Sequence, residues 1–281
     1  MNDVFSIIVL LYNNHEYLDE CLESIMIQNY PHIEIIVVDD GSESFDRDGI
    51  VVFLESKKRA NIVNYIVYQN ETNIGTVKSA NGAIKKATGA YIKLLAADDA
   101  LYDEHSLANA AEALKKSQSG VMTGDVMRCD KELKPISKYR NSLPEALNRL
   151  EPLDVFRRLC IHNDIVAGGV FFSRSFFDQY GLFDESYRLL EDWPTWLKVT
   201  QQGCRIYYSP FYTVRYRFNG GVGTSTNAYY LADKKRVWEN IIFPARKTIG
   251  SYWYLMAKLS FMAINSSFVR KTYGFIFRRD N

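Results

Sequence analysis

The chain has 281 residues, of which 47% are hydrophobic and 24% are charged, as in ordinary globular proteins that bury a core. Its formal net charge of +1 excludes a global electrostatic field that would recruit nucleic acid, so an anionic ligand must be held by a local site. The four cysteines lie far apart without a C-x-x-C pair, which disfavours a disulfide framework or a zinc site.

The ends and apolar runs of the sequence bear on its compartment. The N-terminus lacks the basic start and the small-residue cleavage site of a signal peptide. No stretch contains the roughly 18 consecutive apolar residues needed to cross a bilayer. We therefore expect a cytoplasmic protein.

Short apolar runs alternate with helical patterns in the first part of the chain. They predict, in order, a strand from Phe5 to Leu11, a helix from His15 to Gln28, strands from Ile33 to Val38 and Asn61 to Gln69, a helix from Gly75 to Thr88 and a strand from Tyr91 to Ala96. This alternation predicts a parallel sheet with covering helices, in which ligands bind at the carboxyl ends of the strands. Asp39, Asp40, Asp98 and Asp99 follow two of these strands, so we expect them at one edge of the sheet.

The second part of the chain gives a mixed pattern. It predicts helices from Leu107 to Lys116, Pro152 to Leu159 and Glu191 to Gln202, strands from Val121 to Cys129, Val166 to Phe172 and Arg205 to Ser209, and a polar loop from Asp130 to Pro144. From Ser251 onward the sequence is aromatic, apolar and basic at once.

The adjacent residues Asp98 and Asp99 are candidates for a metal-assisted site. Carboxylates are hard ligands suited to Mg²⁺ or Mn²⁺, which commonly use one or two of them together with substrate phosphates. The alternative is a solvated turn or a helix cap before Ala100. Asp39 and Asp40 can accept hydrogen bonds from a nucleotide base or ribose, and Gly41 permits a tight turn. Alone, this motif is also an ordinary strand-to-turn signal.

Glu191 and Asp192 form a third acidic pair. The functional interpretation is a general base that takes a proton from an acceptor hydroxyl. The neighbouring Trp193 and Trp196 would desolvate it and raise its pKa. The alternative is simple capping of the helix that follows.

Several motifs of other enzyme classes are absent from the sequence. No G-x-G-x-x-G follows the first strand, which disfavours a dinucleotide site, and no Walker-type loop or G-x-S-x-G is present. The four histidines are too dispersed for a metal cluster.

The order of these motifs resembles the family 2 glycosyltransferases with the GT-A fold, over about residues 4 to 220. Three segments carry the resemblance: FSIIVLLYNNHEYLDECLESIMIQNYPHIEIIVVDDGS (5 to 42), NIGTVKSANGAIKKATGAYIKLLAADD (73 to 99) and LLEDWPTWLKVTQQG (189 to 203). The resemblance implies an α/β fold with a Rossmann-like, mixed and mostly parallel sheet flanked by helices. It also implies inverting transfer from a nucleoside-diphosphate sugar, most often a UDP-sugar, to an acceptor hydroxyl.

The resemblance further assigns roles to individual residues. The nucleotide-sugar site would comprise Leu11, Tyr12, Asn13, Asp39, Asp40, Lys78, Asp98 and Asp99. Within it, Asp39 matches the carboxylate that reads the base, and Asp99 matches the ligand of Mn²⁺ or Mg²⁺. Asp192 matches the catalytic base, with its neighbour Glu191 as the alternative.

The sequence departs from the family pattern at four positions. Leu10 stands in place of a frequent proline, and Ala96 replaces the first Asp of many family D-x-D motifs. Ala80 stands where many members have Arg, although Lys78 is close by. Asn219 occupies a position that is His in some members. A metal must therefore depend mainly on Asp99 and the diphosphate.

We expect a GT-A catalytic domain over residues 1–220, with a nucleotide-sugar half at 1–100 and an acceptor half at 101–220. Residues 221–281 would form a helical extension, and its part at 251–281 would pack on the domain, form a homodimer or contact the inner face of the membrane. The expected acceptor is a glycan or a lipid-linked molecule in bacterial surface-polysaccharide or other glycan synthesis, with no role for nucleic acid. A nucleotidyltransferase and a non-catalytic nucleotide-sugar-binding protein remain as alternatives.

Overall fold

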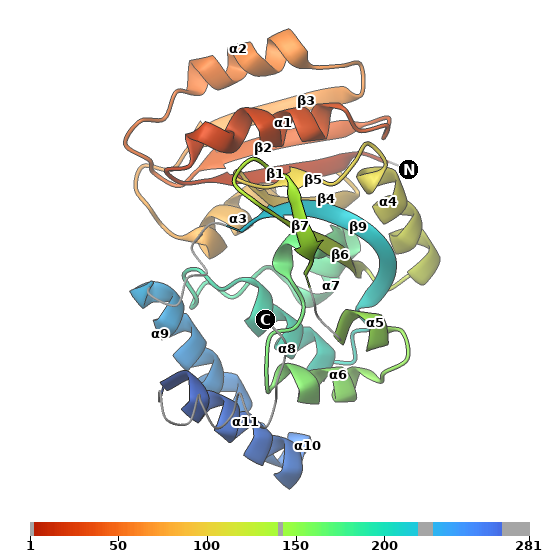
Figure 1. The fold of residues 1–281 in the computed structure, drawn as a ribbon, viewed down its shortest axis with the longest axis vertical. Coiled ribbons are helices and arrows are strands. Elements are labelled where there is room, and N and C mark those ends of the chain that lie inside the picture. Colours follow the sequence, from red (N-terminus) through yellow and green to blue (C-terminus); the bar gives the residue numbers. More distant parts are fainter. Residues whose placement is uncertain (1–2, 140–142, 219–226, 266–281) are drawn as a thin grey trace.

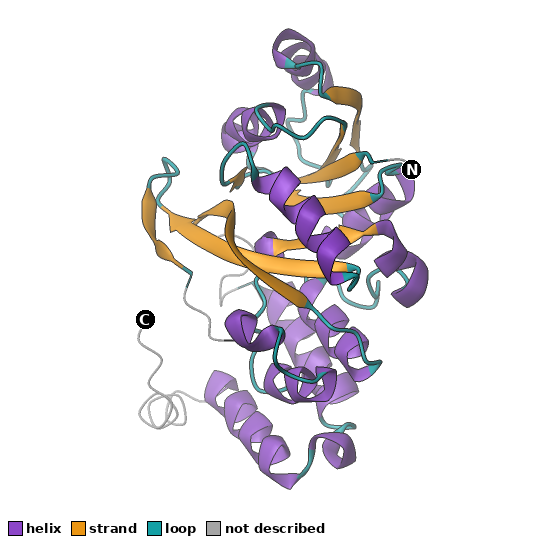
Figure 2. Cartoon of the chain, turned by 90° about the vertical axis from the view of Figure 1, so that its right-hand side faces the viewer, coloured by secondary structure: helices purple, strands orange, loops and turns teal. Residues whose placement is uncertain are grey.

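A computed structural model describes residues 3–139, 143–218 and 227–265. A mixed sheet crosses the upper half of the molecule, and a second group of helices lies below it (Figure 1). The side view in Figure 2 shows the sheet between an upper and a larger lower group of helices. The predicted α/β fold with a C-terminal helical extension is confirmed.

The strands lie between residues 5 and 217. They are β1 (Phe5–Leu11), β2 (Ile33–Asp39), β3 (Ile62–Gln69), β4 (Tyr91–Ala96), β5 (Ala100–Leu101), β6 (Val121–Cys129), β7 (Pro135–Lys138), β8 (Val170–Ser173) and β9 (Tyr207–Arg217). Their order in the sheet is β3-β2-β1-β4-β8-β6-β9-β5, with β7 paired to β6.

The helices cover both faces of this sheet. They are α1 (Leu18–Met26), α2 (Arg47–Lys57), α3 (Thr76–Lys86), α4 (Ser106–Ser117), α5 (Leu143–Leu147), α6 (Pro152–Leu159), α7 (Arg174–Tyr180), α8 (Asp192–Gln201), α9 (Ala228–Val237), α10 (Arg246–Ile249) and α11 (Ser251–Asn265). Short 3-10 turns lie at His15–Tyr17 and Ala167–Gly169, and a π-helical turn lies at Trp238–Ile242.

Alternation along the strands divides the apolar residues between two cores. In β1, Ile7 and Val9 face α1, α2 and α4, whereas Ile8 faces α3 and α8. A strand buried on both faces needs a continuous apolar run, which explains why β1, β2 and β4 were predictable from sequence.

The strand register sets the geometry of the candidate site. β1 pairs in parallel with β2 and with β4, so Leu11 lies opposite Asp39 and Leu10 lies opposite Ala96. The residues that follow β1, β2 and β4 therefore emerge at the same edge of the sheet, as the sequence predicted.

Other expectations need correction. The loop predicted from Asp130 to Pro144 contains the edge strand β7, whose exposed Ile136 gave no buried pattern; residues 140–142 lie outside the described part. The strand predicted to end at Ser209 continues to Arg217. Its pairing with β6 is irregular beside Pro210, a residue that cannot donate to a regular ladder. The residues Ala100 and Leu101 form an edge strand rather than the start of a helix.

The C-terminal helices share a core with the preceding part of the chain. The buried Trp238 packs edge-on against Trp193 of α8, with ring centroids 5.8 Å apart, and against Phe261 of α11 at 5.4 Å. The proposed boundary at residues 220 and 221 lies outside the described residues. Within the described residues, no helix is both long and apolar enough to cross a membrane.

Candidate active site

Asp39 ends β2 and is fully buried. Its carboxylate accepts hydrogen bonds from the backbone N and the Oγ of Ser42, at 2.7 and 2.6 Å, and from Nε2 of Gln69 at 3.0 Å. The Nε2 of His15 lies 3.7 Å from the same carboxylate. These contacts fix Asp39 beside the end of β1.

Asp40 has a different environment, because all its described partners come from the loop and helix at 70–79. Its carboxylate accepts from Asn70 Nδ2 at 3.0 Å, from the backbone N atoms of Ile74 and Gly75 at 3.0 and 2.8 Å, and from Ser79 Oγ at 2.8 Å. Asp40 therefore anchors the loop that leads into α3. Gly75 is required there, since its φ is +93° and an added Cβ would meet Arg188 at 2.5 Å.

The other residues expected near the nucleotide differ in exposure. The side chain of Leu11 is buried, whereas Tyr12 is 46% exposed. Asn13 adopts a left-handed conformation with φ of 54°, and its backbone N donates to Ser42 Oγ at 2.9 Å. Lys78 is exposed in the first turn of α3. The hydrogen bond from Asn13 to Ser42 thus holds the end of β1 against the turn after β2, and the Tyr12 ring is exposed to solvent there.

Asp98 and Asp99 follow β4 and are tied to the end of β9. The backbone N of Arg217 donates to Asp99 Oδ1 at 2.9 Å, and its Nε donates to the backbone O of Asp98 at 2.8 Å. The Arg217 guanidinium is nearly buried, stacks 3.9 Å from the Tyr17 ring centroid and contacts Glu20 at 2.7 Å. Through these contacts Arg217, which is distant in sequence, fixes the turn that contains Asp98 and Asp99.

Burial controls the charge of this acidic pair. Asp99 is 4% exposed, and burial followed by the charge of Asp98 raises its pKa to about 8. Burial also raises the pKa of Asp98. A carboxylate in this state is stabilised in its ionised form by an added cation.

Lys93 lies in β4 and is fully buried. Its ammonium donates to the backbone O of Gly168 and, at 3.1 Å, to that of Val170, and it lies 4.5 Å from the Phe171 ring centroid. Burial lowers its pKa to about 7, opposed by the charge of Asp99. Lys93 thus connects β4 to the 168–170 backbone beneath Asp99.

Glu191 and Asp192 stand at the start of α8 and are half-buried. Asp192 accepts from Asn163 Nδ2 at 2.7 Å and from the backbone N of Trp193 at 2.6 Å. Burial raises the pKa of Asp192, while these bonds and the charge of Lys234 oppose the shift. Burial and the charge of Asp192 raise the pKa of Glu191 to about 8. Asp192 thus receives two hydrogen bonds that favour its ionised form, from Asn163 and from the backbone of Trp193.

Three half-buried tyrosines connect the two acidic pairs. The rings of Tyr139 and Tyr216 meet edge-on with centroids 6.3 Å apart. Burial, and then the charge of Asp99, raises the pKa of Tyr216 to about 12. The pKa of Tyr230 is also raised to about 12, by burial and then by the charge of Asp192. The charge of Tyr230 also contributes to the raised pKa of Tyr216, so the tyrosines act electrostatically on one another and on both acidic pairs.

Helix α9 fixes the backbone that precedes the second acidic pair. The Asp233 carboxylate is buried and accepts from the backbone N atoms of Arg188 and Leu189, at 2.8 and 2.7 Å. Arg188 also donates to the backbone O of Asn73 at 2.8 Å and lies 4.6 Å from the Tyr229 ring centroid. The same helix presents Lys234, whose charge acts on Asp192.

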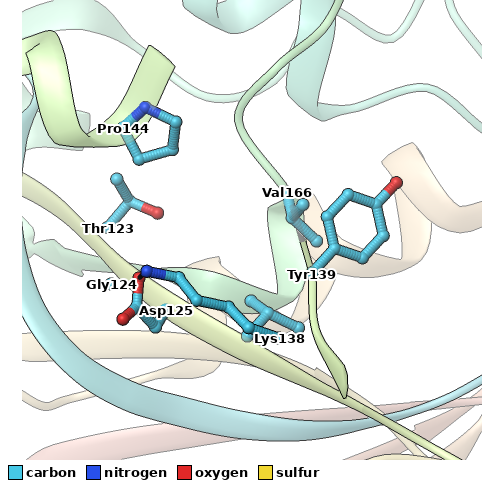
Figure 3. Close-up of a pocket in the computed structure, with 8 residues that line it drawn as sticks. Thr123, Gly124, Asp125, Lys138, Tyr139, Pro144 and Val166 are labelled. Atoms are coloured by element: carbon cyan, nitrogen blue, oxygen red, sulfur yellow. Dashed lines mark ion pairs between the residues drawn. The ribbon is translucent and has the colours of Figure 1, made fainter. Parts of the chain in front are cut away.

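A small cavity of about 20 Å³ is lined by Tyr139, Lys138, Asp125 and neighbouring residues (Figure 3). Lys138 Nζ pairs with Asp125 at 3.0 Å and, outside the lining, with Glu145 at 3.2 Å, and Tyr208 donates to Asp125 at 2.8 Å. The cavity has room for about one water molecule. We interpret it as part of the support for Tyr139.

The residues around the site that sequence reasoning missed include Asn163, Arg217, Asp233, Lys234, Lys93 and the three tyrosines at 139, 216 and 230. Only Lys93 carried a recognisable signal, because a charged residue inside the buried run YIKLLA must find internal partners. The others act through contacts between segments distant in sequence, which no local pattern reveals.

Comparisons with known proteins bear on the family of the chain. Residues 6–181 match the model of glycosyl transferase family 2. The chain belongs to this family. An uncharacterised glycosyltransferase of Haemophilus influenzae is 26% identical over 258 residues, covering 86% of this chain and 74% of the relative. A PGL/p-HBAD biosynthesis glycosyltransferase of Mycobacterium bovis is 28% identical over 191 residues, covering 68% of this chain and 67% of the relative.

Solved structures support the fold. S. aureus TarS 1-349 in complex with UDP-GlcNAc gives a TM-score of 0.60 at 19% identity, covering 94% of this chain and 82% of that one. A longer TarS chain is covered over only 37% of its length. The mannosyltransferase PcManGT of Pyrobaculum calidifontis, in complex with GDP-Man and Mn²⁺, gives 0.57 at 18% identity, covering 93% of this chain and 74% of that one.

Proposed function

We propose that the chain catalyses inverting transfer of a sugar from a UDP-sugar to an acceptor hydroxyl. The observation that carries this proposal is the pair of acidic sites joined by tyrosines: Asp98 and Asp99 after β4, and Glu191 and Asp192 at the start of α8. One site suits a diphosphate with its counter-ion, and the other suits a proton acceptor.

The donor would lie across the carboxyl ends of β1, β2 and β4. Asp39 is placed for the base, and the exposed Tyr12 ring is available for stacking. Asp40 would act mainly by holding the 70–79 loop, which brings Lys78 to the first turn of α3. A uracil base and a ribose offer the N–H and hydroxyl groups that such carboxylates accept.

The residues present fit a divalent cation at Asp99. Among the described residues, no group of three or more His, Cys, Asp or Glu side chains is arranged as a metal cage. Mg²⁺ or Mn²⁺ bound through Asp99 and the diphosphate needs no such cage. The high pKa of Asp99 reflects a buried carboxylate that lacks full compensation. When bound, the cation would neutralise charge that develops on the leaving diphosphate.

Asp192 would act as the base and Glu191 as its protonated neighbour. Asp192 receives two hydrogen bonds that favour its ionised form, and Glu191 has a pKa near 8. Asp192 would accept the proton of the acceptor hydroxyl while the oxygen attacks the anomeric carbon. The bond from that carbon to the diphosphate breaks in line, so no second nucleophilic carboxylate is needed.

The acceptor would be a glycan or a lipid-linked molecule in bacterial surface-polysaccharide or related synthesis. The three tyrosines between the acidic pairs offer aromatic faces and hydroxyls of the kind that bind sugar rings. We place the reaction in the cytoplasm, at the inner face of the membrane.

A thermal-shift screen against UDP-, GDP- and dTDP-sugars, with and without Mn²⁺, tests the donor. We expect a UDP-sugar with Mn²⁺ to raise the melting temperature most. Transfer would then be measured with that donor in wild-type protein and in Asp192→Asn. The variant should bind the donor normally and lose about 10²- to 10⁴-fold in rate.

Two results would contradict the proposal. Donor binding by the wild type without any turnover across a panel of sugar and lipid-linked acceptors would favour a non-catalytic binding protein. Full activity of Asp192→Asn would remove this residue as the base.

A further inference from the structure

The last described helix, α11, has two apolar faces. One face packs into the core through Met256 and Ala257, which are 8% and 0% exposed. On the other side, Tyr252, Leu255 and Met262 are 66%, 56% and 49% exposed. At 3.6 residues per turn these three side chains form one stripe along the helix. We call them the α11 stripe.

This exposure is unusual for large apolar side chains gathered on one helix. Scattered surface apolar residues need no explanation, but a contiguous stripe marks an interaction surface. In Figure 1, α11 lies with α9 and α10 at the lower end of the molecule, away from the sheet edge that carries the donor-site carboxylates. The stripe is therefore separate from the candidate active site.

Cations border the stripe along one side. Lys258 is exposed on α11, one turn from Leu255 and Met262. Arg246 is exposed on α10, which packs against α11. The Tyr254 ring lies 5.3 Å from the Arg246 guanidinium and 5.1 Å from Lys258 Nζ, so it gathers both cations at the same edge.

The sequence around the stripe is strongly segregated in charge. In the described part of the chain, residues 240–265 contain Arg246, Lys247 and Lys258 and no Asp or Glu, and the sequence from 266 to 279 adds four more Lys or Arg and no acidic residue. Residues 1–239 contain 27 Lys or Arg against 32 Asp or Glu, so the C-terminal part of the sequence is basic and the rest is acidic. An aromatic and apolar helix with cations beside it has the composition of helices that lie in the headgroup region of anionic membranes.

We propose that the α11 stripe, with Lys258 and Arg246 beside it, is a docking surface for an anionic lipid bilayer. The 15 residues of α11 that the structure describes are too few to span the hydrocarbon region, and this part of the helix would lie in the plane of the interface. The apolar side chains would enter the boundary between headgroups and acyl chains, and the cations would meet lipid phosphates. This inference is independent of the proposed transferase activity.

A second copy of the chain fits this surface less well. A two-fold contact between two stripes would bring Lys258 and Arg246 toward the same residues of the partner copy. Stable dimers bury roughly 800 Å² per partner, an area that three partly buried side chains do not provide.

The test is co-sedimentation of the full chain with phosphatidylcholine vesicles, with and without phosphatidylglycerol. We expect binding only to the anionic vesicles, weakened by salt. The double variant Leu255→Ser/Met262→Ser should bind more than about tenfold more weakly. The matched variant Val52→Ser/Val63→Ser, which changes residues 68% and 50% exposed on α2 and β3, should bind like wild type.

A second variant, Arg246→Gln/Lys258→Gln, tests the same surface if Leu255→Ser/Met262→Ser disturbs folding. It should lose anionic selectivity at an unchanged melting temperature. The proposal is overturned if wild type ignores anionic vesicles, or if both α11 variants still sediment as wild type does. It is also overturned if light scattering shows a dimer that Leu255→Ser/Met262→Ser dissociates, since the stripe would then bind a second copy.

Discussion

The hydrogen bond from Asn163 to Asp192 should set the pH at which the proposed base works. Nδ2 of Asn163 lies 2.7 Å from Oδ2 of Asp192, in a half-buried site where burial already raises the pKa of that carboxyl. The bond favours the ionised form. Removing it in Asn163→Ala should therefore raise the pKa of Asp192 further.

The magnitude follows from the strength of the bond. A hydrogen bond to a charged group contributes about 1.5–3 kcal/mol, and one pKa unit corresponds to about 1.4 kcal/mol. Loss of the hydrogen bond should therefore raise the pKa of Asp192 by about one to two units. Water that enters the half-buried site would replace part of the bond, so we expect the lower value. Because the base must be deprotonated, the acid limb of kcat/KM should move about one unit to higher pH.

The assay is transfer rate against pH, with the donor identified by the thermal-shift screen. Below the limb, Asn163→Ala should be about tenfold slower than wild type, and well above it the two should be equal. Asn109→Ala, which changes an exposed residue of α4, is the control and should leave the limb in place. An unmoved limb in Asn163→Ala, or a loss that is equal at every pH, would refute the reasoning.

Three further outcomes are expected. Asp40→Ala should lower the free energy of unfolding by about 3–5 kcal/mol in urea, because four donors lose a buried carboxylate; a change under about 1 kcal/mol would contradict this. Asp233→Ala should reduce kcat/KM more than about tenfold. Asp233→Asn should retain most activity, because its side-chain carbonyl can accept the same two hydrogen bonds from the backbone of Arg188 and Leu189. Equal kinetics of the two variants would count against a positioning role for Asp233. Because the pKa of Asp99 is about 8, Mn²⁺ binding with nucleotide should weaken about tenfold per unit below pH 8, and calorimetry on Asp99→Asn should show that this dependence is gone.

Much of the structure up to β4 could be predicted from the sequence, because the signals there are local. β1, β2 and β4 are buried on both faces, so their apolar runs and the polar residues that end them are visible without the fold. Parallel pairing then brings Asp39 and Asp99 to one edge with no further information. The helix α2 escaped prediction because only Ile50 and Leu54 are buried along it.

The part of the chain after β4 was less predictable because its geometry depends on contacts between residues far apart in sequence. Arg217 reaches Asp99 across 118 positions of sequence, and Asp233 reaches Leu189 across 44. A single-sequence pattern cannot rank such pairs. The predicted rise of the pKa at Glu191 and Asp192 agrees with the structure, in which burial is the main cause of both shifts.

The contact of Asp233 with the backbone of Arg188 and Leu189 limits how this protein can be engineered. A chimera that joins residues 1–220 to the C-terminal part of another family member would transfer the donor pocket intact. It would leave the segment before Glu191 without its buried acceptor unless the new helix also supplied a carboxylate at the place of Asp233. Exchanging the extension therefore also changes the support of the proposed base, and a suitable junction would keep α8 and α9 from the same parent.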